Sequence, residues 1–160
     1  MSGPSGSGKT RLLTRLIPAL RRRGLKVGAL KHAGHAHDLD RPGKDSARLR
    51  RAGAVAVVVQ ARAELAFFGL PLRGGARALA RLLPPVDLVL AEGFKGEALP
   101  RLEVHRRAVS RDFLCARDRR VVAVIGDEPP PRDLPRFRPS EVERLADFVV
   151  RRFRLRVRRS

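Results

Sequence analysis

The sequence predicts an α/β fold in three layers, with a mostly parallel sheet. Two observations favour this class. Short apolar segments that suit buried strands alternate with amphipathic segments at helical spacing, which is typical of a parallel sheet covered by helices on both faces. A glycine-rich G-x-x-x-x-G-K-[ST] motif also stands directly before the first amphipathic segment. The length of 160 residues suits one domain around one core.

Local patterns predict the elements in order. Five apolar side chains share one helical face and Gly24 ends that first helix; they are Leu12, Leu13, Leu16, Ile17 and Leu20. Further helices are expected over 44–51 and 75–83, and a last one from Ser140, which forms an S-x-x-E capping box with Glu143. Strands are expected at 25–30, 54–60, 86–91, 102–105 and 121–125, and a strand or a turn at 63–70. The nearly all-apolar segment 54–60 predicts a strand buried on both faces.

The composition excludes several classes of protein. There are 35 Lys and Arg against 16 Asp and Glu, and the net charge of +19 favours anionic partners such as nucleic acid, membrane surfaces or phosphorylated small molecules. Trp and Tyr are absent, which disfavours nucleic acid, because single-strand sites usually stack bases on aromatic side chains. No apolar run is long enough to span a membrane. Cys115 is the sole cysteine, which excludes an internal disulfide and a cysteine zinc cage, and a cytoplasmic protein is expected.

Residues 3–10 match the phosphate-binding loop (P-loop, or Walker A motif) at every fixed position. Glycines let successive backbone N–H groups point at phosphate oxygens, and the following helix adds its dipole. Lys9 is expected to reach the β- and γ-phosphates of a nucleotide, and the Thr10 hydroxyl to bind Mg²⁺. The predicted phosphate-binding set is Gly3, Ser5, Gly6, Ser7, Gly8, Lys9 and Thr10. The fold expected is therefore that of P-loop NTPases.

A phosphate loop normally follows a buried strand, yet only Met1 and Ser2 precede Gly3. We expect that the sequence starts late and that its first strand lies upstream; an in-frame apolar run there would establish this. If the strand is missing altogether, the sheet is one strand short and nucleotide binding is impaired. One P-loop nucleotide-binding domain is expected over 1–153, followed by a frayed Arg-rich tail over 154–160.

The segment 86–93 resembles a Walker B strand and offers two acids, Asp87 and Glu92. They lie roughly 16 Å apart along a strand, on opposite faces. Only Glu92 falls at the carboxyl edge, where ligands of open α/β sheets bind. We predict that it holds a water of the Mg²⁺ shell or orients the attacking water. Asp87 is expected to cap or form a turn, and Lys95 to face an anionic ligand.

Three His and two Asp fall within the segment 32–40, which follows a predicted strand at its carboxyl end. We interpret this segment as a loop that contacts nucleotide, Mg²⁺ or substrate. A solvated loop and a zinc site are the alternatives, and a zinc site is disfavoured because the spacing of the histidines lacks a helical i,i+4 pair.

Two further residues can contact a nucleotide. Lys44 opens the next helix and can meet phosphate. Asp127, after the strand 121–125, is predicted to accept a hydrogen bond from a purine N–H, although no N/T-K-x-D guanine signature is present.

Three motifs in order, GPSGSGKT (3–10), LKHAGHAHDLDRPGKDSARLRRAGA (30–54) and DLVLAEGFK (87–95), resemble the MobB family of molybdopterin-guanine dinucleotide biosynthesis adaptor proteins. The resemblance runs over residues 3–127. It implies GTP with Mg²⁺, weak GTPase activity at most, a homodimer, and partnership with the molybdenum cofactor guanylyltransferase, which attaches GMP to molybdopterin. It also implies that five residues line the loop beside the nucleotide, with the two Asp at the metal: Lys31, His32, Asp38, Asp40 and Lys44.

Two other functions are compatible with the motifs. A P-loop kinase would phosphorylate a small metabolite or nucleotide, with the His- and Arg-containing loop as a substrate lid. A nucleic-acid-binding ATPase is suggested by the net charge and by the Arg-rich tail. The kinase predicts fast phosphoryl transfer to an acceptor, and the ATPase predicts binding that weakens steeply with salt.

Overall fold

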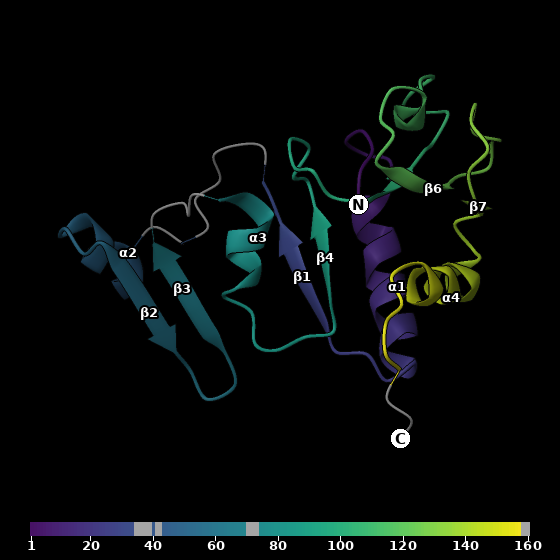
Figure 1. The fold of residues 1–160 in the computed structure, drawn as a ribbon. Helices are drawn as coiled ribbons and strands as arrows, with labels where there is room; N and C mark the ends of the chain where they lie inside the picture. The colour runs from purple at the N-terminus through teal and green to yellow at the C-terminus, as the bar shows by residue number, and fades with distance from the viewer. Residues whose placement is uncertain (34–39, 41–42, 70–73, 158–160) are drawn as a thin grey trace. The chain divides into compact units, whose positions relative to one another are not determined.

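A computed structural model describes residues 1–33, 40, 43–69 and 74–157 (Figure 1). The chain forms two compact units, one of Met1–His32 with Gly75–Ser160 and one of Ala33–Gly74. In the described part of the chain, no helix is both long enough and apolar enough to cross a membrane.

The strands of the larger unit run parallel to the neighbours with which they pair. One pair consists of β1 (Val27–Lys31) and β4 (Leu88–Glu92). The other group has the order β5 (Arg101–Val104), β6 (Val121–Ile125) and β7 (Arg136–Phe137). The predicted α/β class with mostly parallel strands is confirmed, whereas the three-layer arrangement stays a prediction.

Met1 and Ser2 lie between β4 and β5 and bond to both. The Met1 α-amine donates to the Ala91 carbonyl at 2.6 Å. The Ser2 N–H donates to the Leu102 carbonyl at 2.9 Å, and the Ser2 carbonyl accepts from the Val104 N–H at 2.8 Å. These two residues therefore occupy the place of a central strand at the carboxyl ends of β4 and β5.

Two long helices cover this unit and share its core. The amphipathic α1 (Lys9–Arg22) packs beside α4 (Val142–Arg152), as Figure 1 shows. Leu16 and Leu20 of α1 are fully buried with Leu145 of α4 and Ile125 of β6. The shorter α3 (Gly75–Ala80) contacts β1, and a 3₁₀ turn, η1 (Leu114–Ala116), precedes β6.

The predicted capping box at Ser140 is wrong. α4 begins at Val142, its N-cap is Glu141, and no side chain caps it. Glu143 instead accepts from Arg22, the last residue of α1, at 2.5 Å and from its C-cap Arg23 at 2.8 Å. Asp147 accepts from Arg23 at 2.7 Å. Charge-assisted bonds to two arginines outcompete a backbone cap for this carboxylate.

The smaller unit corrects a second prediction. Here β2 (Ala56–Gln60) and β3 (Leu65–Gly69) form an antiparallel hairpin beside α2 (Asp45–Arg51). Only Val57 of β2 is buried, so 54–60 is not a strand buried on both faces. The hairpin partner follows after a short turn, and an isolated two-stranded hairpin can bury one face at most. Val58 and Phe67 therefore pair across the strands on the exposed face.

Replacing Arg23 by Met tests the link between α1 and α4. Arg23 is half-buried, with 19% of its side chain exposed, and it donates to Glu143, Asp147 and the Ala19 carbonyl. We expect Arg23→Met to lower the free energy of unfolding by about 1 kcal/mol. Arg21→Met, an exposed change in the same turn, serves as the control.

The effect of Arg23→Met depends on pH. The hydrogen bonds from Arg23 lower the pKa of Asp147 and of Glu143 below their usual values of 3.8 and 4.5. Carboxylates with a lowered folded-state pKa stabilise above their unfolded pKa and lose this as pH falls. Urea unfolding at pH 7 and pH 3 should therefore show a smaller difference at pH 3. An equal difference at both pH values would contradict this electrostatic link.

Candidate functional site

The phosphate loop lies between β5 and α1, and glycine is required where it starts. Gly3 has φ +141°, and a Cβ there would lie 2.4 Å from the Val104 carbonyl oxygen. Gly6 and Gly8 also have positive φ, and Gly8 is the N-cap of α1. The Ser7 Oγ is buried without a hydrogen-bond partner among the described residues. The loop therefore offers a curled backbone, a free hydroxyl and a helix N-terminus to an anion.

Lys9 folds back across this loop. Its Nζ donates to the Pro4 carbonyl at 2.6 Å. Burial lowers the pKa of Lys9; the nearby Lys95 and Lys31 lower it further, whereas Glu92 opposes them. A phosphate would relieve this repulsion among cations, so Lys9 is electrostatically prepared for an anionic ligand.

Thr10 and Glu92 meet at the mouth of the loop. The Thr10 hydroxyl donates to the Glu92 carboxylate, 2.9 Å from Oε2 and 3.1 Å from Oε1. Glu92 ends β4, as the strand-end argument predicts, and Asp87 lies at the other end, where it accepts from the Lys26 N–H at 2.7 Å. Hydroxyl and carboxylate oxygens are the ligands that Mg²⁺ prefers, together with phosphate and water. The donor set therefore fits this ion, although metal binding by Thr10 and Glu92 stays a prediction.

Lys31 and His32 lie beside Glu92 on the neighbouring strand. Lys31 is in register with Glu92, and the His32 N–H donates to the Glu92 carbonyl at 2.8 Å. The next residue, Gly93, has φ +106°, and a Cβ there would lie 2.7 Å from the His32 carbonyl oxygen. Lys95 lines a hollow with Gly3 and Pro4. The structure thus brings Lys9, Lys31, Lys95 and Glu92 to one edge.

A groove on the other side of the loop reaches Asp127. It is lined by Ser7 and Gly8 of the loop, Arg11 and Arg15 of α1, and Asp127 after β6. The Asp127 carbonyl accepts from Arg136 at 2.7 Å, which holds this turn, and the side chain is exposed. The groove therefore joins the phosphate loop to the residue predicted to contact a purine.

Three predicted residues lie outside this edge or outside the described chain. Asp40 and Lys44 belong to the smaller unit. Asp40 is buried there, accepts from the Ser46 hydroxyl at 2.8 Å, and lies 3.6 Å from the Arg50 guanidinium. Lys44 is exposed at the N-cap of α2. Asp38 falls outside the described residues. Asp40 thus has a structural role in the smaller unit, and its binding of metal stays a prediction.

Comparison with known proteins decides the family. The family described as molybdopterin guanine dinucleotide synthesis protein B, MobB, matches residues 1–127. The chain belongs to the MobB family. Curated relatives agree, and both are called molybdopterin-guanine dinucleotide biosynthesis adapter protein. The one from Escherichia coli (strain K12) is 40% identical over 91% of this chain and 87% of its own. The one from Haemophilus influenzae is 35% identical over 93% and 85%.

Solved MobB structures share the fold. A crystal structure of molybdopterin-guanine biosynthesis protein B is 33% identical with a TM-score of 0.71, covering 95% of both chains. Bacillus subtilis MobB is 25% identical with a TM-score of 0.70, covering 98% of this chain and 96% of its own. The resemblance drawn from the three motifs is therefore confirmed.

Sequence reasoning missed the arginines and the aromatic pair beside the candidate site. Arg11 and Arg15 follow the P-loop motif on one helical face, and this spacing could have identified them. His105 follows β5 at its carboxyl end, the same signal that identified Glu92. It is buried and stacks on Phe113 with ring centroids 3.7 Å apart, and nothing in the sequence pairs these two rings.

Gly3→Ala tests whether close packing against β5 shapes the loop. We expect a cost of about 3 kcal/mol in the free energy of unfolding, from a forbidden φ and a clash with the Val104 carbonyl. Gly6→Ala is the control, since φ is +76° but its Cβ would meet nothing within 4 Å. It should cost about 1 kcal/mol. Urea unfolding measures both, and equal costs would contradict the packing argument.

Proposed function

We propose that this MobB chain is a GTP-binding adapter in molybdopterin guanine dinucleotide biosynthesis, within molybdenum cofactor maturation. The observation that carries the nucleotide part is the bond between Thr10 and Glu92 at the mouth of a loop crossed by Lys9. A hydroxyl, a carboxylate and an ammonium gathered in this way support the binding of a nucleotide with Mg²⁺. The family carries the adapter part.

On binding, Lys9 exchanges the Pro4 carbonyl for phosphate oxygens, and its pKa rises toward the usual value as the anion offsets Lys31 and Lys95. Thr10 would hold Mg²⁺ through its hydroxyl oxygen, and Glu92, which now accepts from that hydroxyl, would hold a water bound to the ion. Bound Mg²⁺ supplies positive charge to the phosphates. Weak GTPase activity at most, which the resemblance to the MobB family implies, is part of the proposal.

Asp127 is proposed to favour guanine. Asp127 lines the groove that begins at Ser7 and Gly8. A carboxylate accepts from the N1–H and 2-amino groups of guanine, whereas adenine presents an acceptor at N1. GTP should therefore bind more tightly than ATP.

A homodimer and a guanylyltransferase partner complete the proposal. The exposed face of the hairpin in the smaller unit carries Val58, Leu65 and Phe67, with exposed fractions of 59%, 70% and 54%. Large apolar side chains gathered on one face mark protein contact surfaces. The name adapter, given to the curated relatives, supports partners in the pathway. We propose that the protein brings its nucleotide site to the guanylyltransferase, which acts on molybdopterin.

Calorimetry with GTP and ATP in the presence of Mg²⁺ tests the nucleotide part. We expect the protein to bind GTP more tightly than ATP, and Lys9→Ala to lower the affinity for GTP about 100-fold. Asp127→Asn should reduce the difference between the affinities for GTP and for ATP. Lys26→Ala is the matched control, because Lys26 is exposed and lies at the opposite end of the sheet, beside Asp87. It should bind as the wild type does.

Three results would contradict the proposal. Tighter binding of ATP than of GTP, or an affinity for GTP that is unchanged in Lys9→Ala, would contradict the proposed GTP site. Transfer of the γ-phosphate to a small acceptor at about 1–100 s⁻¹ would favour a kinase. Hydrolysis stimulated by DNA or RNA, with binding that weakens steeply with salt, would favour a nucleic-acid-dependent ATPase.

A further inference from the structure

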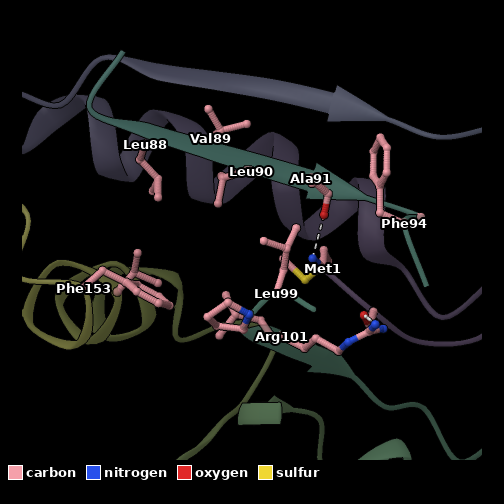
Figure 2. Close-up of a pocket in the computed structure, with 14 residues that line it drawn as sticks. Met1, Leu88, Val89, Leu90, Ala91, Phe94, Leu99, Arg101 and Phe153 are labelled. Carbon is pink, nitrogen blue, oxygen red and sulfur yellow. Dashed lines mark hydrogen bonds between the residues drawn. The ribbon is translucent and has the colours of Figure 1, made fainter. Parts of the chain in front are cut away.

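A buried arginine lies beside the loop that follows β4. Arg101, the first residue of β5, is only 5% exposed. An arginine is almost never buried this deeply unless its charge is paired. Figure 2 shows its side chain reaching in the direction in which β4 runs, toward the end where Phe94 follows. Arg101 therefore places a buried positive charge near the carboxyl end of β4, where the candidate site lies.

The Arg101 guanidinium holds backbone oxygens of this loop. Its Nη2 donates to the carbonyls of Lys95 and Glu97, the second of these at 3.0 Å. Its Nη1 donates to the hydroxyl of Ser2, which directly precedes the phosphate loop, at 3.2 Å. The Glu97 N–H also donates to the Phe94 carbonyl at 3.2 Å, which closes the loop into a turn. One side chain thus contacts both the residue before the phosphate loop and the turn that carries Lys95.

Asp118 and Arg120 complete this network. The Asp118 carboxylate lies 3.2 Å from the Arg101 Nε and accepts from the Arg120 Nε at 2.8 Å. Hydrogen bonds from Arg120, and to a smaller extent the charge of Arg101, lower the pKa of Asp118, so this carboxylate is ionised at neutral pH. Arg120 also donates to the Glu97 carbonyl at 2.9 Å. The Glu97 carbonyl therefore has two arginine donors, whereas among the described side chains only Arg101 donates to the Lys95 carbonyl.

Lys95 is the residue whose position depends most on Arg101. It lines the hollow beside Gly3 and Pro4 of the phosphate loop. Burial, and next the charges of Lys95 and Lys31, lower the pKa of Lys9, so Lys95 acts on the same point of the site as Lys9 does. The Lys95 side chain is exposed, and a lysine stem is flexible. The backbone of Lys95 therefore decides where its ammonium group can reach.

We propose that Arg101 is a positioning residue, which fixes the Lys95 backbone so that the Lys95 ammonium group meets the phosphates that Lys9 also binds. This inference rests on the proposed nucleotide site. Without the bond from Arg101, Lys95 samples positions away from Lys9, and an anion must then also compensate the entropy lost when the turn is ordered. Arg101 itself does not touch the nucleotide, because it is buried and its N–H groups are directed to Ser2, Lys95 and Glu97.

A double-mutant cycle on the affinity for GTP, measured by calorimetry with Mg²⁺, tests the proposal. We expect Arg101→Met and Lys95→Ala each to lower the affinity about tenfold. In the Lys95→Ala protein, Arg101→Met should lower it less than about twofold further, because the effect of Arg101 passes through Lys95. Arg120→Met is the matched control. It removes one donor to the Glu97 carbonyl but keeps the bond to the Lys95 carbonyl, so it should lower the affinity less than about twofold.

Arg101→Met should still fold, because Asp118 keeps its bonds to Arg120 and is not left as an unpaired buried charge. Thermal unfolding checks this for each variant. If Arg101→Met does not fold, Asp118→Asn replaces it in the cycle, since it keeps the guanidinium and removes its counter-charge. We expect Asp118→Asn to lower the affinity for GTP about threefold, and to have no effect in the Lys95→Ala protein.

Lys9→Ala, measured in the same series, separates this inference from the nucleotide site itself. If Lys9→Ala leaves the affinity for GTP unchanged, the site and the inference fail together. If Lys9→Ala weakens binding but Lys95→Ala or Arg101→Met does not, the nucleotide site stands and the positioning role is overturned. An equal loss from Arg101→Met with and without Lys95 would also overturn it, because Arg101 would then act on the fold and not through Lys95.

Discussion

Every feature at the carboxyl edge of the larger unit depends on the backbone pairing of Met1 and Ser2. Three hydrogen bonds, to Ala91, Leu102 and Val104, link Met1 and Ser2 to both β4 and β5. We call the backbone pairing of Met1 and Ser2 with β4 and β5 the seam. Gly3 follows the seam at the point where both strands end. The side chain that closes β4, Glu92, then lies within hydrogen-bond distance of Thr10 in the first turn of α1. A parallel sheet thus turns short sequence motifs into one site.

Helix packing keeps that edge in place. α1 carries Lys9 and Thr10 at its first turn and buries Leu16 and Leu20 against α4 and the strands. At its other end, Arg23 joins it to α4 through Asp147 and Glu143. Some of the positive charges of the chain, such as Arg23, therefore stabilise helix packing. Those near the phosphate loop, Lys9, Lys31 and Lys95, would together attract an anion.

The sequence predicted the site residues that lie at the ends of strands. The P-loop motif, Glu92 and the opposite placement of Asp87 follow from strand direction and alternation, which are local properties. The hairpin was mistaken for a buried strand because β-branched apolar runs look alike in both settings, and burial depends on neighbours. The capping box failed because Glu143 meets arginines far away in the sequence. The stacking of His105 on Phe113 is likewise a tertiary contact without a local pattern.

A crystal structure with Mg²⁺ and a non-hydrolysable GTP analogue tests the central claim most directly, that the seam builds a nucleotide site. We predict the β- and γ-phosphates within the loop of residues 3–10, the Thr10 hydroxyl on the metal, and the Lys9 Nζ moved from the Pro4 carbonyl to phosphate. A well-ordered nucleotide bound elsewhere, with Lys9 still on Pro4 and Thr10 still on Glu92, would contradict it.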